Sequence, residues 1–247
     1  MLVRATAIPL ALHPYASTSC IVHWLTRHHG KISTLLKGAQ RPKSAFLGEY
    51  QLFGTSELLY FTHRSSTLYT GKECALLQPR TAFRTDWRAM QAASYLTALV
   101  NKTTPEDAPH PELFELFEEL LDFAVDYGRF PQFLLWAELR FCRHHGHAPQ
   151  LANCLLCAAK TDLRFCASQG GIVCRTCARE NKFPTLDCPP DVLAILRAWQ
   201  AAGHPASVVQ TQLNGRQRTA LDAIAAAFMH AQFNLNPEHR NAATQAA

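Results

Sequence analysis

Four cysteines in the second half of the chain have the spacing of a metal site. They form two C-x2-C pairs, Cys154 with Cys157 and Cys174 with Cys177, separated by 16 residues. Each pair can turn two thiolates onto one face of a knuckle, and two knuckles complete a tetrahedron around Zn²⁺. Because four thiolates leave no position for a reactive water, the pattern predicts one structural zinc ion per chain.

The residues between the two pairs read as a hairpin that brings the second pair back to the first. The stretch LRFCASQGGIVC has Gly170 and Gly171 where the turn is expected. Cys166 lies between the pairs and is a competing ligand. A redox pair is the alternative, although such a pair normally begins a helix that follows a strand. The other cysteines read as buried small hydrophobic residues: Cys20, Cys74, Cys142 and Cys188.

A second group of residues, KGAQRPKS at 37–44, could bind phosphates. It contains three cations and no acid. Gly38 and Pro42 favour a turn over a helix or a central strand. A solvated surface loop is the simple alternative. The functional interpretation is that Lys37, Arg41 and Lys43 contact the backbone of a nucleic acid.

The positive charge of the chain is concentrated at its N-terminal end. The formal net charge is +5, yet residues 1–80 contain nine Lys or Arg and only three acids. The remaining residues contain 15 cations and 16 acids. This asymmetry indicates a polyanion-binding module joined to a nearly neutral body.

The basic stretch is flanked by short strands, and the cysteines by helices. Five strands are expected within residues 1–80, which favours a small closed barrel of the OB or SH3-like type. Aromatic residues of such a barrel, Tyr15, Trp24 and Phe46, could stack on bases, although Trp24 fits the core better. The predicted class is α+β: an OB-fold barrel over 1–80, then a helical domain over 81–236 with a zinc element at 148–182. Residues 237–247 are expected to form a disordered tail.

Composition and motifs limit the classes of function. No apolar run is long enough to cross a membrane, and the N-terminal segment lacks the features of a signal peptide, which favours the cytoplasm. No P-loop, HExxH pair or G-x-S-x-G elbow occurs, so no enzyme is indicated. His144, His145 and His147 fit cations at a helix C-terminus better than metal ligands. A zinc-containing RNA-binding or ribosome-associated factor remains the alternative to a DNA-binding protein.

Several segments resemble the RecO family of bacterial recombination mediators. The resemblance is strongest over residues 30–44, which end in KGAQRPKS, and at the four cysteines. Segments such as SYLTALV and PELFEL, and the residues from HPYAST onward, also fall where that family has similar stretches. The resemblance spans nearly the whole chain.

The resemblance implies a function as well as a fold. Family members bind single- and double-stranded DNA, anneal complementary strands and, with RecR, load RecA onto DNA coated by single-stranded-DNA-binding protein. It implies zinc on the four cysteines, DNA contacts by Lys37, Arg41 and Lys43, and Arg27 and Lys31 as their neighbours. A nucleoid-associated protein of the bacterial cytoplasm is expected. Gln40 and Ala45 stand where the family often has cations, which suggests weaker DNA binding.

Overall fold

The computed structural model describes residues 1–63, 66–235 and 237–245. It contains two compact units, Met1–Asp126 and Tyr127–Ala247. The helices that follow the barrel up to residue 126 belong to the first unit. The last barrel strand ends at Gln78, and the division between the compact units falls later in the chain, after Asp126.

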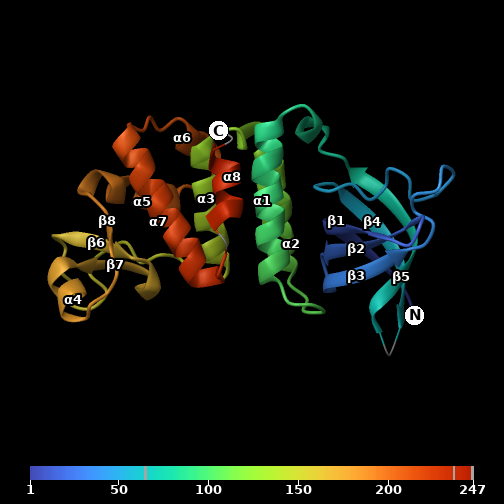
Figure 1. Cartoon of the computed structure of the whole chain (residues 1–247), viewed down its shortest axis with the longest axis horizontal. Helices are drawn as coiled ribbons and strands as arrows, with labels where there is room; N and C mark the ends of the chain where they lie inside the picture. The colour runs from blue at the N-terminus through green and yellow to red at the C-terminus, as the bar shows by residue number, and fades with distance from the viewer. Residues whose placement is uncertain (64–65, 236, 246–247) are drawn as a thin grey trace. The chain divides into compact units, whose positions relative to one another are not determined.

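The first unit begins with a closed five-stranded barrel (Figure 1). Its strands pair in the order β1-β2-β3-β5-β4, and β1 closes the barrel by pairing with β4. The pair β3–β5 is parallel, and the others are antiparallel. This is the arrangement of an OB-fold, and the predicted fold class is confirmed. The strands are β1 (Leu2–Tyr15), β2 (Ser19–Thr26), β3 (Gly30–Leu36), β4 (Thr55–His63) and β5 (Ser66–Gln78).

Alternation along β2 and β3 explains the barrel core. Even-numbered residues of both strands point inward, and Trp24 and Ile32 are almost completely buried. The indole of Trp24 donates a hydrogen bond of 2.8 Å to the hydroxyl of Thr34, so its one polar group is satisfied. The prediction that Trp24 belongs to the core is confirmed.

Two helices complete the first unit, α1 (Trp87–Thr103) and α2 (Pro111–Tyr127), after the short 3-10 helix η1 (Thr81–Arg84). Asp86 caps α1 by accepting hydrogen bonds from the backbone of Arg88 and Ala89. Polar contacts attach α2 to the barrel. The buried guanidinium of Arg80 donates to the carboxylate of Asp122 at 2.7 Å and to the carbonyl of Phe53.

The second unit combines helices with the segment that carries the four cysteines. That segment, residues 148–189, is called the cysteine element below. Its strands β6 (Leu163–Cys166), β7 (Gly171–Cys174) and β8 (Leu186–Asp187) form a small antiparallel sheet next to α4 (Arg175–Glu180). The 3-10 helix η2 (Ala167–Gln169) joins β6 to β7. The other helices are α3 (Pro131–His144), α5 (Pro190–Ala201), α6 (Pro205–Val209), α7 (Gly215–Phe233) and α8 (Pro237–Gln245).

The described C-terminal residues are helical where a disordered tail was expected over 237–247, of which residues 246 and 247 lie outside the described part. Residues Pro237–Gln245 form α8, and the buried guanidinium of Arg240 donates two hydrogen bonds to the carboxylate of Glu138 on α3, at 2.8 and 3.1 Å. Glu138 is itself buried. Because either charge would be costly to bury alone, each group needs the other, and the pair holds α8 against α3.

The histidine cluster lies at the C-terminal end of α3, which includes His144 and has His145 as its C-cap. The backbone N–H of His145 donates to the carbonyl of Phe141, and Gly146 follows with a φ of +72°. Within the described residues, the four cysteines are the only group of three or more metal-binding side chains close enough to share an ion. No helix in the described parts of the chain has the length and apolarity to cross a membrane.

Candidate metal centre and nucleic-acid interface

The first cysteine pair lies in a tight loop before β6. The backbone N–H of Cys154 donates to the carbonyl of Ala159, and the N–H of Ala158 donates back to the carbonyl of Cys154. Ala158 takes a left-handed backbone, with a φ of +59°, which closes the loop. The knuckle predicted from the C-x2-C spacing is therefore present, with Cys154 buried and Cys157 exposed.

The second pair lies where β7 passes into α4. Cys174 is the N-cap of α4, and its sulfur accepts a hydrogen bond from the backbone N–H of Cys177. The predicted hairpin brings this pair to the first one. Leu163 of β6 pairs with Cys174 of β7, and the turn contains Gly170 with a φ of +79°.

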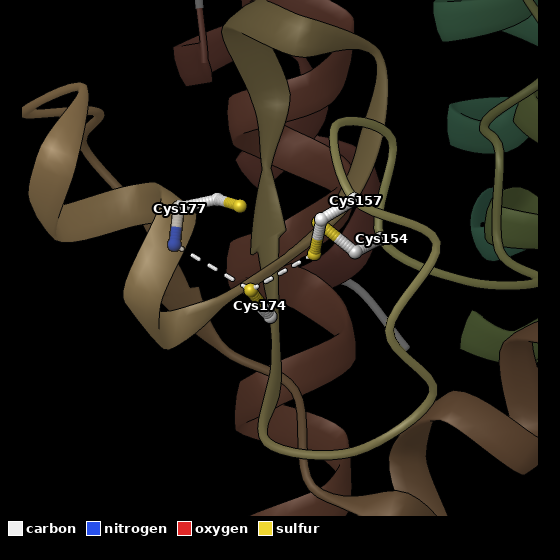
Figure 2. A group of neighbouring side chains, drawn as sticks. All are labelled: Cys154, Cys157, Cys174 and Cys177. Carbon is white, nitrogen blue, oxygen red and sulfur yellow. Dashed lines mark hydrogen bonds between the residues drawn. The ribbon is translucent and has the colours of Figure 1, made fainter.

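The four sulfur atoms point into one common space (Figure 2). All four lie within 4.8 Å of one another, and the sulfurs of Cys157 and Cys174 are 3.6 Å apart. A tetrahedral ion with Zn–S bonds of about 2.3 Å would separate its sulfurs by about 3.8 Å. The donor set and its spacing therefore fit a tetrahedral metal ion bound by four thiolates.

Hydrogen bonds within the cluster shift the pKa values of the Cys154 and Cys177 thiols in opposite directions. Burial opposes ionisation of Cys154, but backbone hydrogen bonds from Cys174, Cys157 and Leu156 outweigh it and lower the pKa of Cys154 to about 6. Side-chain hydrogen bonds with Cys157 and Cys174 raise the pKa of Cys177. Several thiolates cannot share so small a space without a cation, which a bound metal ion would supply.

The remaining cysteines lie outside the cluster. Cys166 is buried, its sulfur lies 3.4 Å from the hydroxyl of Ser168, and it is not one of the four grouped sulfurs. Burial raises the pKa of Cys74 to about 12 and that of Cys188 to about 11. All nine cysteines are free thiols. The prediction that Cys20, Cys74, Cys142 and Cys188 are buried is confirmed.

We expect Gly171→Ala to loosen the metal centre. The backbone of Gly171 packs directly on that of Gln150, and an added Cβ would collide with the Gln150 carbonyl oxygen. Relieving the collision should cost roughly 1–3 kcal/mol and accelerate transfer of the bound metal to a chelator. Gly203→Ala is the control, because no atom lies near the position of its added Cβ. Equal transfer rates for the two variants would contradict the expectation.

The basic stretch forms a loop that starts at the end of β3. Lys37, Arg41 and Lys43 are all exposed, and these three residues are called the basic loop below. None of the ion pairs found in the described parts of the chain involves them. Gly38 takes the left-handed backbone, with a φ of +67°, and the side chain of Arg41 packs over it. The predicted turn and the predicted exposure of its cations are therefore present.

Hydrogen bonds and buried side chains anchor the basic loop to the barrel. The backbone N–H of Gly38 donates to the hydroxyl of Ser19, and that of Gln40 donates to the carbonyl of Thr18. Ala39 and Phe46 insert into the barrel core. The cations therefore project from a fixed base, which reduces the entropy lost when they bind a ligand.

Two predicted neighbours of the basic loop have different roles. Arg27 donates to the carboxylate of Glu118 on α2 at 3.2 Å, and its guanidinium lies over the ring of Phe114. The side chain of Lys31 is only 12% exposed. Its ammonium donates to the carbonyl of Asn101 and lies 3.7 Å from the carboxylate of Glu106. Both cations hold the helices against the barrel, so the structure does not place them with the basic loop.

The three aromatic residues considered for base stacking differ in their exposure to solvent. Phe46 and Trp24 are buried, whereas Tyr15 is 50% exposed. Tyr15 ends β1 and pairs with Ser19, the residue whose hydroxyl accepts the hydrogen bond from Gly38. Among the three, Tyr15 is therefore the one available beside the basic loop.

Comparison with known proteins assigns the family. The sequence model described as "Recombination protein O N terminal" matches residues 1–80, and that described as "Recombination protein O C terminal" matches residues 84–202. Together they cover more than half of the chain. The chain belongs to the recombination protein O family. The resemblance found in the sequence is thus confirmed.

Curated relatives within the recombination protein O family carry the name "DNA repair protein RecO". The protein of Exiguobacterium sibiricum is 32% identical over 184 residues, which are 74% of this chain and 73% of the relative. The protein of Bacillus pumilus is 28% identical over 200 residues, covering 80% and 76%. That of Bacillus subtilis is 27% identical over 201 residues, with the same coverage.

The sequence interpretation did not identify the acids that pair with cations of the barrel. Glu118 accepts hydrogen bonds from Arg27 and from the hydroxyl of Thr55, and Asp122 accepts from Arg80. A signal was available, because Glu118 lies between the buried Phe114 and Leu121 on α2, beside the apolar face of the helix. An acid beside such a row indicates a cationic partner from another element.

Proposed function

We propose that the protein is a non-enzymatic mediator of DNA repair and homologous recombination that binds single- and double-stranded DNA. Membership in the recombination protein O family and the name shared by its relatives support the repair role. The observation that carries the DNA-binding part is the basic loop, with three exposed cations on an anchored turn of an OB-fold barrel. OB-folds commonly bind single strands.

The basic loop would bind the backbone and not the bases. Lysine ammonium groups and an arginine guanidinium recognise phosphates through charge and hydrogen bonds, independently of sequence. Each phosphate neutralised on a single strand contributes about −0.7 to the slope of log K against log salt, so three contacts correspond to a slope near −2. We therefore expect binding with little sequence preference and strong salt dependence.

Strand annealing follows from charge neutralisation alone. Two strands repel each other through their phosphates, and a cationic surface that holds one strand lowers the repulsion felt by the second. Complementary bases then meet more often. The mechanism requires no general acid, base or nucleophile.

Partner proteins enter the proposal through the family. Cooperation with RecR and single-stranded-DNA-binding protein, and indirect loading of RecA, would place the protein with the nucleoid in the bacterial cytoplasm. The metal we propose is Zn²⁺, because soft thiolates arranged as a tetrahedron suit this ion. Residues Cys154, Cys157, Cys174 and Cys177 would hold it, with a role in folding.

An annealing assay tests the proposed function. We expect the full-length protein to accelerate pairing of complementary DNA oligonucleotides about tenfold or more at low salt, and we expect added salt to remove the effect. Fluorescence quenching between labelled strands measures the rate. No acceleration at any salt concentration would contradict the proposal. Competition that strongly favours RNA strands over DNA would support the alternative of an RNA-binding factor.

A further inference from the structure

A second concentration of cations lies on the cysteine element. Two adjoining hollows open on its surface, and Arg164 and Arg175 line both of them. One hollow also contains Arg179 and Lys182 and has no acid in its lining. The other also contains Lys160 and Arg197, together with two acids, and the guanidinium of Arg197 donates to the carbonyls of Leu151 and Ala152. The five cations other than Arg197 are called the cationic groove below, and they form one continuous surface because the two hollows share Arg164 and Arg175.

The cationic groove keeps an excess of positive charge after internal pairing. Arg164 is paired with Asp187 at 2.5 Å, and Arg175 with Asp162 at 3.3 Å. Both acids are mainly exposed, so these pairs contribute little to stability. Arg175 is itself half exposed and can exchange partners, whereas Arg164 is more buried and also donates to the hydroxyl of Thr185. The other three cations have no acidic partner among the described residues: Lys160, Arg179 and Lys182.

The backbone of the cysteine element sets the positions of these cations. Arg175 and Arg179 are four residues apart on α4, which places their side chains on one face of the helix. Lys182 follows in a turn closed by a hydrogen bond from its own N–H to the carbonyl of Arg179. Because Cys174 and Cys177 flank Arg175, metal binding would fix this end of the groove.

The shape and charge of the surface select its ligand. An open groove with several unpaired cations suits a long polyanion, which can contact many of them at once, better than a small anion. One hollow is lined by cations and no acid, so its charge is complementary to the regularly spaced negative charges of a nucleic-acid backbone. A competing role is internal: the same cations would offset the negative charge of four thiolates around a divalent metal.

We propose that the cationic groove is a second nucleic-acid backbone site, carried by the cysteine element and distinct from the basic loop. The proposal deepens the proposed function and rests on it, since the ligand is the same polyanion. Each chain then has two surfaces that hold a strand, one in each unit. A protein that brings two strands together can use both.

The double variant Arg179→Ala/Lys182→Ala tests the groove in the full-length, metal-loaded protein. Neither side chain has an acidic partner among the described residues, so the substitutions leave no carboxylate of that part of the chain unpaired. With a fluorescent single-stranded oligonucleotide, we expect the slope of log K against log salt to become shallower by about 1.4, or about 0.7 for each lost phosphate contact. Metal content and melting temperature should match those of the wild type.

The control is Arg143→Ala/Arg218→Ala, which makes the same change of charge on exposed residues of α3 and α7. Equal slopes for the two double variants would overturn the proposed groove site while leaving the proposed function intact, provided the wild type binds DNA.

Two other outcomes would also overturn the groove site. Loss of metal together with loss of DNA binding would show that the cations serve to offset the charge of the thiolates. Loss of binding to a polyglutamate peptide with DNA binding unchanged would assign the groove to an acidic protein segment, which also overturns it. A wild type that binds no DNA overturns both proposals.

Discussion

Cys174→Ser is expected to abolish tight metal binding and unfold the cysteine element. Cys174 is one of the four proposed metal ligands, caps α4 and ends β7, so its loss would affect the metal site, the helix and the strand together. The hydrophobic cluster of this element contains six buried residues, and three of them are grouped cysteines. So small a core cannot replace a structural zinc ion, whose binding supplies folding free energy on the order of 10 kcal/mol or more.

The measurements are metal content by elemental analysis and amide hydrogen exchange over residues 148–189. We expect less metal than one ion per chain and rapid exchange in this range, while the barrel stays protected. Cys166→Ser is the matched control, because Cys166 lies in the same hairpin, is buried, and has a hydroxyl as its neighbour. Full metal content in Cys174→Ser would contradict the assignment of this ligand. A visible charge-transfer absorption in the wild type would indicate iron in place of zinc.

The second large effect concerns the basic loop. We expect Lys37→Ala/Arg41→Ala/Lys43→Ala to make the salt slope of single-strand binding shallower by about 2 and to remove most of the annealing activity. The reason is that the three side chains are exposed and unpaired in the described structure, so their charge is available to phosphates. The fold should persist, because Ala39, Phe46 and the backbone anchors of the loop are unchanged.

Two controls separate charge from loop structure. The variant Lys37→Arg/Arg41→Lys/Lys43→Arg keeps all three charges and should retain the slope. Gln40→Ala changes an exposed neutral side chain of the same loop and should bind like the wild type. If the triple alanine variant anneals strands as fast as the wild type, the basic loop is not the DNA site.

The features that the sequence by itself determined are local in the chain. Two residues separate the cysteines of each pair, and a hairpin of a dozen residues joins the pairs, so the metal centre follows from neighbouring turns. The basic loop is equally local, because Gly38 sets the turn and three cations lie within seven positions. Five short strands separated by turn residues within about 80 positions were enough to predict a small closed barrel.

Tertiary structure decided which cations remain available to a ligand. Arg27 and Lys31 donate hydrogen bonds to groups 91 and 70 positions away in the chain, and Arg240 donates to a carboxylate 102 positions away. Local periodicity carries no information on such pairings, because they depend on how whole elements pack. The cationic groove has the same origin: Lys160, Arg164, Arg175, Arg179 and Lys182 are spread over 23 positions of the sequence, and only the folded hairpin and α4 bring them to one surface.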